Sequence, residues 1–237
     1  MMRLALGITV TFLLAGCGNT TSPSSPTATP AQEPGTPPPP APAATARYRV
    51  TFRATWSEAT HPDRFPNTPH FSPLVGATHD AATRFWEAGG IASEGIERMA
   101  ELGSVSPLDD TIRTAIDQGG AQFLLLGGGI ARSPGEVSLE FDIGRDFPYV
   151  TLVSMVAPSP DWFVGISAAN FLASGDWPGE IVFELFPYDA GTDNGSVYTA
   201  PDDDSNPQDA IRRITGFPFT VGGVVAPMGT FTFTRLP

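Results

Sequence analysis

Two acidic stretches, Pro158–Gly165 and Asp189–Gly195, carry the residues of this chain best suited to binding a cation. Asp161 is the one charged residue of the first stretch, between prolines that exclude helix and a following apolar run. The second stretch places Asp189 and Asp193 four residues apart, each followed two positions later by a glycine that can take positive φ. Calcium takes several carboxylate and carbonyl oxygens in a flexible shell. These residue types therefore suit a Ca²⁺ site, provided that the two stretches meet.

A simpler interpretation of the second stretch stays open. Asp-x-Gly and Asn-Gly sequences often form turns in which the side chain accepts backbone hydrogen bonds. In this interpretation, Asp189 and Asp193 stabilise a turn and bind no metal. Three carboxylates brought together repel one another unless a cation neutralises them. An EF-hand is excluded, because the twelfth position counted from Asp189 is Ala200 and not the bidentate Glu of that loop.

The elements that must position the aspartates are two strands expected at 149–157 and 180–188. Each strand ends just before one of the acidic stretches. If the two strands run in the same direction, both stretches lie at one end of the fold. A shared cation site requires this arrangement.

The rest of the folded region predicts a mainly β protein. Residues 47–56 alternate between apolar and polar side chains, which is typical of a half-buried antiparallel strand. Residues 57–78 are predicted to be irregular, followed by short helices at 80–88, 93–102 and 108–118. Further strands are expected at 137–143, 149–157, 162–167, 181–188, 217–225 and 229–235. This pattern predicts an antiparallel β-sandwich with short helices inserted near its start.

The first 46 residues are predicted to lie outside this domain. Residues 1–17 read as a secretory signal that ends in Leu-Ala-Gly-Cys, a pattern typical of a bacterial lipobox with Cys17 as the lipidated residue. Residues 18–46 are rich in proline and nearly uncharged, and they are predicted to form a disordered tether. The folded domain is expected at 47–237. We therefore expect a lipid-anchored protein of the cell envelope, exposed outside the cytoplasm.

Composition excludes several partners. The formal net charge of −12 argues against binding to nucleic acid or to anionic lipid and is compatible with divalent cations. With a single cysteine, which the lipobox would use, the domain has no disulfide within the chain.

Evidence for catalysis is weak. The chain has no Gly-x-Ser-x-Gly, His-Glu-x-x-His or Gly-Lys phosphate loop. Glu136, Glu140 and Asp142 share one face of a predicted strand, so a carboxylate-dependent hydrolase acting on polysaccharide is the alternative function. His61, His70 and His79 recur every nine residues, which is not a zinc-ligand spacing, and we expect His70 and His79 to hold loops by hydrogen bonds.

Several motifs resemble those of the spondin domain, the amino-terminal region of F-spondin and mindin. Besides the two acidic stretches, the motifs are His70–His79, Phe85-Trp86, Gly89, Ala92-Ser93, Gly95 and Ala100–Gly103, in the family's order, and the resemblance covers roughly residues 47–237. It implies a β-sandwich related to the C2 type, with calcium bound by the aspartates that match Asp161, Asp189 and Asp193. Animal spondin domains are disulfide-bonded, and this chain departs from them there.

By this resemblance, the predicted function is a surface-anchored, calcium-binding adhesion or ligand-binding module without catalytic activity. Its partner would be an extracellular glycan, a matrix polymer or a protein, with the membrane reached through the lipid anchor. A structural envelope protein is a further alternative.

Overall fold

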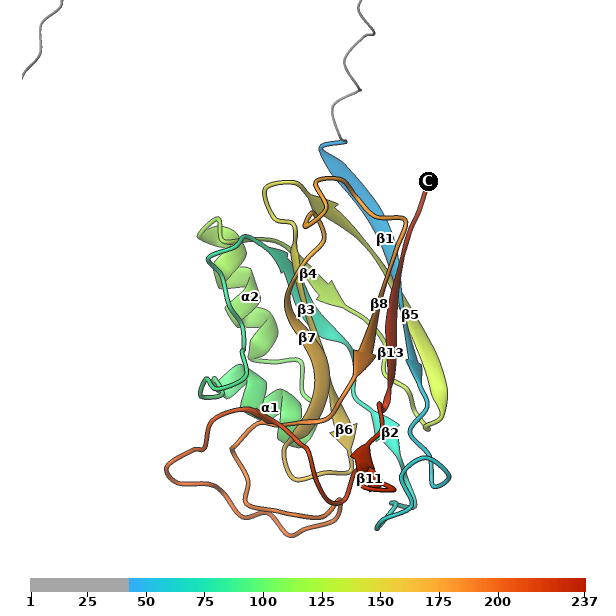
Figure 1. Cartoon of the computed structure of the whole chain (residues 1–237). Coiled ribbons are helices and arrows are strands. Elements are labelled where there is room, and N and C mark those ends of the chain that lie inside the picture. The colour runs from blue at the N-terminus through green and yellow to red at the C-terminus, as the bar shows by residue number, and fades with distance from the viewer. Residues whose placement is uncertain (1–42) are drawn as a thin grey trace, which may run out of the picture. The chain divides into compact units, whose positions relative to one another are not determined.

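The computed structural model describes residues 43–237 as two antiparallel β-sheets packed face to face, with two helices on the outer side of the second sheet (Figure 1). The prediction of a mainly β, antiparallel sandwich is confirmed. The signal, the lipobox and nearly all of the tether lie outside the described residues. No helix of the described part is both long enough and apolar enough to cross a membrane.

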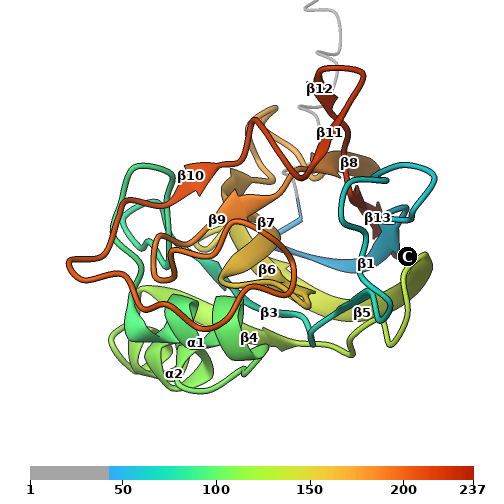
Figure 2. The ribbon, with the colours of Figure 1, turned by 90° about the horizontal axis from the view of Figure 1, so that it is seen from below.

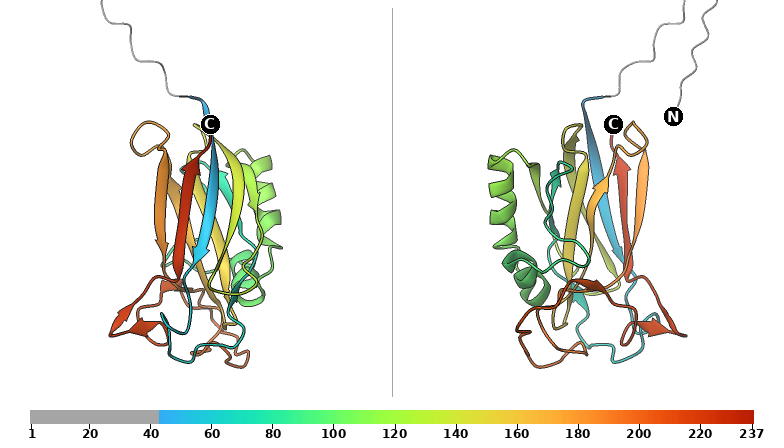
Figure 3. Two further views of the ribbon diagram at one scale, coloured as in Figure 1. Left: turned by 90° about the vertical axis from the view of Figure 1, so that its right-hand side faces the viewer. Right: turned by 60° about the vertical axis from the view of Figure 1, so that its left-hand side comes forward.

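The first sheet has four strands, and Figure 3 shows them side by side. Their order is β5 (Gly135–Gly144), β1 (Thr45–Ala54), β13 (Gly229–Arg235) and β8 (Glu180–Leu185). Burial alternates along each strand, because successive side chains point to opposite faces. The inward side chains form one core with the second sheet, including Tyr48, Val50, Phe52, Phe231 and Phe233.

The second sheet is built around β6. Its order is β10 (Arg212–Arg213), β9 (Tyr188–Asp189), β7 (Trp162–Asn170), β6 (Tyr149–Ala157), β3 (Val75–His79) and β4 (Ala121–Leu126), while β2 (His70–Phe71) also pairs with β6. A separate small hairpin joins β11 (Thr220–Val221) to β12 (Val224–Val225).

β6 is nearly continuous apolar sequence because both of its faces are covered. Val150 and Leu152 belong to the core between the two sheets. Val153 and Met155 belong to a second core under the helices. A central strand with two buried faces needs apolar residues on both, which explains the absence of alternation.

Both helices lie on the outer face of the second sheet, and the helices expected at 93–102 and 108–118 are confirmed. α1 (Glu94–Leu102) begins after Ser93, whose hydroxyl accepts the N–H of Ile96, and it ends at Gly103 in the left-handed conformation. α2 (Leu108–Asp117) buries Ile112 against the same core.

Five expectations about local structure were wrong or incomplete. The single strand expected at 181–188 is divided into β8 and β9, which belong to different sheets. Residues 80–88 form turns instead of a helix, because Asp80 Oδ1 accepts the N–H groups of Ala82 and Thr83 and so favours a local turn. The stretch expected to be irregular includes β2 and β3. β4 was not predicted. The strand expected at 217–225 is reduced to the β11–β12 hairpin.

The direction of the strands fixes where the acidic stretches lie. β8 is antiparallel to β13, which is antiparallel to β1, so β8 and β1 run the same way. Figure 1 shows that β6 also runs in this direction, so the loops after β6 and β8 lie at the same end of the sandwich. The start of β1 and the C-terminus lie at the opposite end. Figure 2 looks onto the loop end, where β9, β10 and the β11–β12 hairpin also lie.

Candidate metal centre

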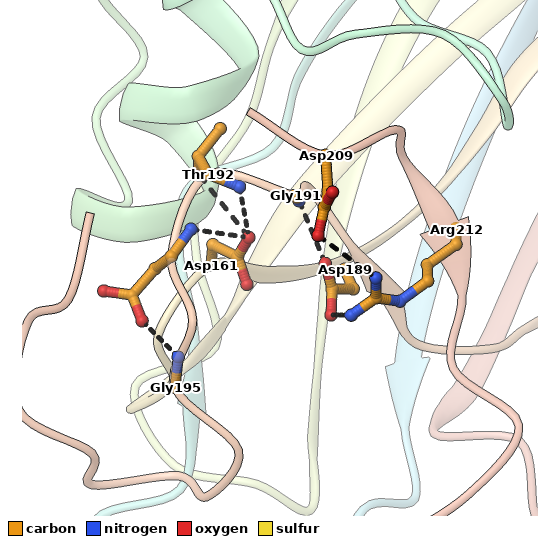
Figure 4. A network of polar contacts seen from close by, with 8 residues as sticks. Asp161, Asp189, Gly191, Thr192, Gly195, Asp209 and Arg212 are labelled. Carbon is orange, nitrogen blue, oxygen red and sulfur yellow. Dashed lines mark hydrogen bonds and ion pairs between the residues drawn. The ribbon is translucent and has the colours of Figure 1, made fainter. Parts of the chain in front are cut away.

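Asp161 is fully buried where the loop after β6 enters β7. Its carboxylate Oδ2 accepts the backbone N–H groups of Thr192 at 2.8 Å and of Asp193 at 3.2 Å (Figure 4). Its other oxygen, Oδ1, is buried and has no hydrogen-bond partner. A buried carboxylate oxygen without a partner is costly, which marks Asp161 as the centre of the site.

Backbone pairing brings the two acidic stretches together. Trp162 of β7 is paired with Asp189 of β9, and the N–H of Ala190 donates to the backbone oxygen of Asp161 at 3.1 Å. Residues 189–193 therefore run beside Asp161, as the sequence-based geometry requires.

Asp189 is 7% exposed and uses both carboxylate oxygens. Oδ1 accepts the N–H of Gly191 at 2.9 Å. Oδ2 forms an ion pair with Arg212 Nη2 at 2.7 Å, and Arg212 also lies 3.8 Å from Asp209 (Figure 4). Asp189 is therefore held both by its own turn and by a cation from β10.

Asp193 is also 7% exposed and accepts two backbone hydrogen bonds. Its Oδ1 accepts the N–H of Gly195 at 2.6 Å, and its Oδ2 accepts the N–H of Asp203 at 2.9 Å. The predicted turn role of Asp189 and Asp193 is thus present in the structure. The cluster Asp202–Asp204, which reads as a solvated loop, is exposed and contributes only backbone at this point.

The electrostatics of the site favour a positive charge near Asp161. The pKa of Asp161 is raised to about 6, chiefly by burial and also by the neighbouring charges of Asp189 and Asp193, against the lowering effect of the two backbone donors. Burial also raises the pKa of Asp189, while Arg212 and Gly191 lower it. The carboxyl without a cationic partner is the one most destabilised by ionisation.

The three carboxylates do not converge on one point as they stand. Among residues 43–237, no group of three or more His, Cys, Asp or Glu side chains is arranged to hold a metal ion. Asp161 nevertheless offers a free, buried oxygen, and the adjacent aspartates supply the hard oxygen donors that Ca²⁺ prefers. The residues fit a divalent cation if Asp189 Oδ2 exchanges Arg212, and Asp193 Oδ2 exchanges the N–H of Asp203, for it.

Sequence reasoning missed several residues of the site. Arg212 and Asp209 belong to a segment with no local motif, and only the pairing of β10 with β9 brings Arg212 to Asp189. Glu101 of α1 lies on another side of the site: burial raises its pKa, a hydrogen bond with Thr192 lowers it, and nearby charges that include Asp193 raise it. Glu101 lies within the family motif Ala100–Gly103, but nothing in the sequence links it, Asp209 or Arg212 to the two acidic stretches.

A cavity of about 360 Å³ opens beside Asp189. Its lining includes Trp162, Asp189, Asp193, Asp209, Arg212 and Phe217. A ligand that reached the aspartates through this cavity would meet both signs of charge and two aromatic rings.

His70 lies in β2 and His79 at the end of β3, and both form hydrogen bonds to the backbone of the neighbouring loops. His70 Nδ1 bonds to Thr68 O at 2.8 Å, and His79 bonds to Asp80 O and to the hydroxyl of Thr151. The zinc interpretation gains no support within the described residues.

The carboxylates of the alternative hydrolase lie on the exposed face of the first sheet. Glu140 is held there by Arg47 at 3.2 Å and by Arg49 at 2.6 Å. Hydrogen bonding and charge from these arginines lower the pKa of Glu140, the opposite of what a general acid needs.

Comparisons with known proteins identify the family of the folded domain. The sequence matches the Spondin_N family over residues 46–219. It is similar to Spondin-1 of Gallus gallus, with 39% identity over 177 residues, and to Spondin-1 of Homo sapiens, with 38%; each match covers 72% of this chain and 22% of the relative. Spondin-2 of Rattus norvegicus is 31% identical over 195 residues, covering 81% of this chain and 58% of the relative. The chain thus spans about a fifth of Spondin-1.

Proposed function

The chain belongs to the Spondin_N family, and on that premise we propose that its folded domain is a non-enzymatic, calcium-binding module for adhesion or extracellular ligand binding. The observation that carries the proposal is the unpartnered Oδ1 of Asp161, fully buried beside Asp189 and Asp193. Ca²⁺ would be held by these three aspartates. When bound, it supplies the positive charge that the buried carboxylates lack.

The residues of the chain have separate roles in this proposal. Asp161 provides the oxygen that is already free, and its Oδ2 fixes the 192–193 backbone beside it. Asp189 and Asp193 are ordered by hydrogen bonds from Gly191 and Gly195, which hold their side chains close to the centre. Calcium would then stabilise the loops at this end of the sandwich. Extracellular calcium modules bind the ion with dissociation constants of about 10⁻⁴–10⁻³ M.

We further propose that the domain is lipid-anchored through Cys17, with residues 18–46 as a tether to the cell envelope. The aspartate loops lie at the end of the domain opposite the start of β1 (Figure 1). A tether that joins β1 would therefore attach to the domain at the end far from the loops. The ligand class that suits this arrangement is an extracellular glycan, a matrix polymer or a protein.

Thermal unfolding of the full chain tests the calcium site. Saturating Ca²⁺ should raise Tm relative to EDTA, and Asp189→Ala should abolish the increase. Asp142→Ala, which removes an exposed acid on β5, is the control and should keep the full response. An unchanged Tm of the wild-type chain at saturating Ca²⁺ would sink the calcium proposal.

A glycan array probed with and without Ca²⁺ tests the binding function. Calcium-dependent binding that Asp189→Ala removes would support a ligand site at the loops. Calcium stabilisation without binding to any glycan or matrix polymer would restrict the ion to a structural role.

The anchor is tested separately by palmitate labelling in bacterial cells. Cys17→Ser should abolish labelling and release the chain from the membrane fraction. Labelling that persists in this variant would contradict the lipobox.

A further inference from the structure

The outer edge of β8 carries unused backbone hydrogen-bonding groups. β8 is the last strand of the four-stranded sheet and pairs only with β13 (Figure 3). In the register with β13, the N–H of Arg235 donates to Gly179 O, so the odd-numbered residues of β8 face β13. The N–H and C=O groups of Glu180, Val182 and Glu184 therefore point to the open edge.

The side chains of the same three residues lie on the exposed face of the sheet. Val182 is 53% exposed, and acids stand two residues before and after it. On the same exposed face, near the opposite edge of the sheet, Glu140 is neutralised by Arg47 and Arg49 of the adjacent strand. Within residues 43–237, neither Glu180 nor Glu184 has such a basic partner. The edge thus presents an acid–apolar–acid row that lacks a neighbouring strand.

A cleft lies beside this edge and can receive the inward side chains of an added strand. Its volume is about 640 Å³, and Trp86, Phe183, Phe186 and Tyr188 contribute to its lining. The far wall is the Gly165–Ala169 part of β7. This part has no neighbouring strand on the side away from β6, because β9 pairs only with Trp162 and Phe163. The charges at the rim are mixed, with Arg84, Arg213, Glu87 and Glu184.

A second copy of this chain is a poor occupant. Antiparallel pairing of two β8 edges about Val182 would place Glu180 of one copy opposite Glu184 of the other, and like charges directly opposite destabilise a sheet. A partner strand with basic residues at these positions would repeat the Arg49–Glu140 pairing already present across the sheet. The overall charge of −12 favours the same partner.

We propose that the open edge of β8 binds an extended basic segment of a partner protein, which adds to the first sheet as a fifth strand. Basic side chains face Glu180 and Glu184, an apolar one packs beside Val182, and the alternate apolar side chains enter the cleft. Main-chain hydrogen bonds supply affinity and the charge row supplies selectivity. The site is separate from the aspartate loops and does not rest on calcium.

The probe is the peptide acetyl-Thr-Lys-Ile-Val-Ile-Lys-Thr-amide, whose palindromic centre suits either strand direction. It is titrated into the full chain in EDTA, so that the result is independent of the metal site. Binding should protect the amide protons of Val182 and Glu184 from hydrogen exchange measured by NMR. A peptide with Glu in place of both Lys should bind at least tenfold more weakly.

Charge reversal locates the site. Glu180→Lys/Glu184→Lys should weaken the basic peptide at least tenfold and improve the acidic one. Glu136→Lys/Asp142→Lys makes the same charge change on β5, at the opposite edge of the sheet. This variant should weaken binding of the basic peptide by less than threefold. The proposal is overturned if both double variants lose binding equally, if protection appears away from β8, if the basic peptide does not bind, or if the chain dimerises through this edge instead.

Discussion

Arg212 Nη2 lies 2.7 Å from Asp189 Oδ2, while Asp189 Oδ1 accepts the N–H of Gly191. Both carboxylate oxygens of Asp189 are therefore in use, one of them by a guanidinium that is 60% exposed and free to move into solvent. Arg212 supplies the positive charge that a cation would otherwise bring to this carboxylate. A cation that binds Asp189 has to displace it.

Removing this competitor should strengthen calcium binding. Arg212→Gln is expected to raise the Ca²⁺ affinity by up to about fivefold, because an ion pair with an exposed partner is worth about 0.2–1 kcal/mol. Isothermal titration calorimetry measures the change. Arg213→Gln is the matched control, since Arg213 stacks on Phe186 at 3.5 Å and touches none of the three aspartates. Weaker binding in Arg212→Gln would show instead that Arg212 positions Asp189 for the ion.

Asp161 should make the metal-free domain less stable as pH rises. The pKa of Asp161 is raised to about 6 from an ordinary value of 3.8, so the folded state holds a proton that the unfolded state has released between these values. The free energy of unfolding therefore falls as pH increases from about 4 to beyond 6. In EDTA, Asp161→Asn should be more stable than wild type at pH 7 by up to about 3 kcal/mol, and equally stable near pH 4.

Urea unfolding between pH 4 and 8 checks this expectation. Asp142→Asn, an exposed change, should follow the wild-type curve. In saturating Ca²⁺ the order should reverse, because only wild type gains from the ion. A difference between Asp161→Asn and wild type that does not vary with pH would contradict the assignment.

Position 191 requires glycine for two reasons, its left-handed backbone conformation and the lack of room for a Cβ atom. Its φ is +76°, and a Cβ there would lie 2.3 Å from Asp209 O. Gly191→Ala should lower the free energy of unfolding by more than the roughly 1–2 kcal/mol of the left-handed conformation alone. Gly175→Ala, at φ +89° with open space, should show only that smaller cost, and Gly216→Ala, with neither constraint, almost none. Equal losses in the first two variants would exclude the steric contribution.

His79 should give the opposite pH dependence to Asp161. Burial lowers the pKa of His79 below its ordinary value of 6.5, against the raising effect of its bond to Asp80 O. As pH falls below 6.5, the unfolded state takes up a proton before the folded state does, so stability falls with acidification. The stability advantage of wild type over His79→Gln should therefore be larger at pH 7.5 than at pH 5. His70→Gln serves as the control, and a constant difference for His79→Gln would refute the prediction.

Much of the fold was predictable because local patterns and tertiary burial agree. The Phe-Thr alternation of β13 and the apolar run of β6 predicted both strands with their observed bounds. Ser93 and Gly103 mark the ends of α1 with hydrogen bonds that are local in sequence. In such segments the residues that form the element are also the residues that signal it.

β3 shows why other segments could not be predicted. It has five residues, all of them buried, so it has no alternation. A Cβ at Gly76 would lie 2.0 Å from Thr151 O, which shows how closely this strand approaches β6. Pairing with β4 and β6 on both sides makes these residues a strand, and that pairing is not encoded within the segment.

The sequence alone indicated the class of fold, the family motifs and the three candidate aspartates, because each depends on residue types and their spacing. The tertiary structure decided that the loops after β6 and β8 meet. It also decided that Asp161 Oδ2 accepts a hydrogen bond from the N–H of Thr192, 31 residues away, and that Arg212 forms an ion pair with Asp189. These relationships depend on the direction and register of strands that are distant in the chain. Such pairing is set by the packing of the whole sandwich, so no single stretch of sequence records it.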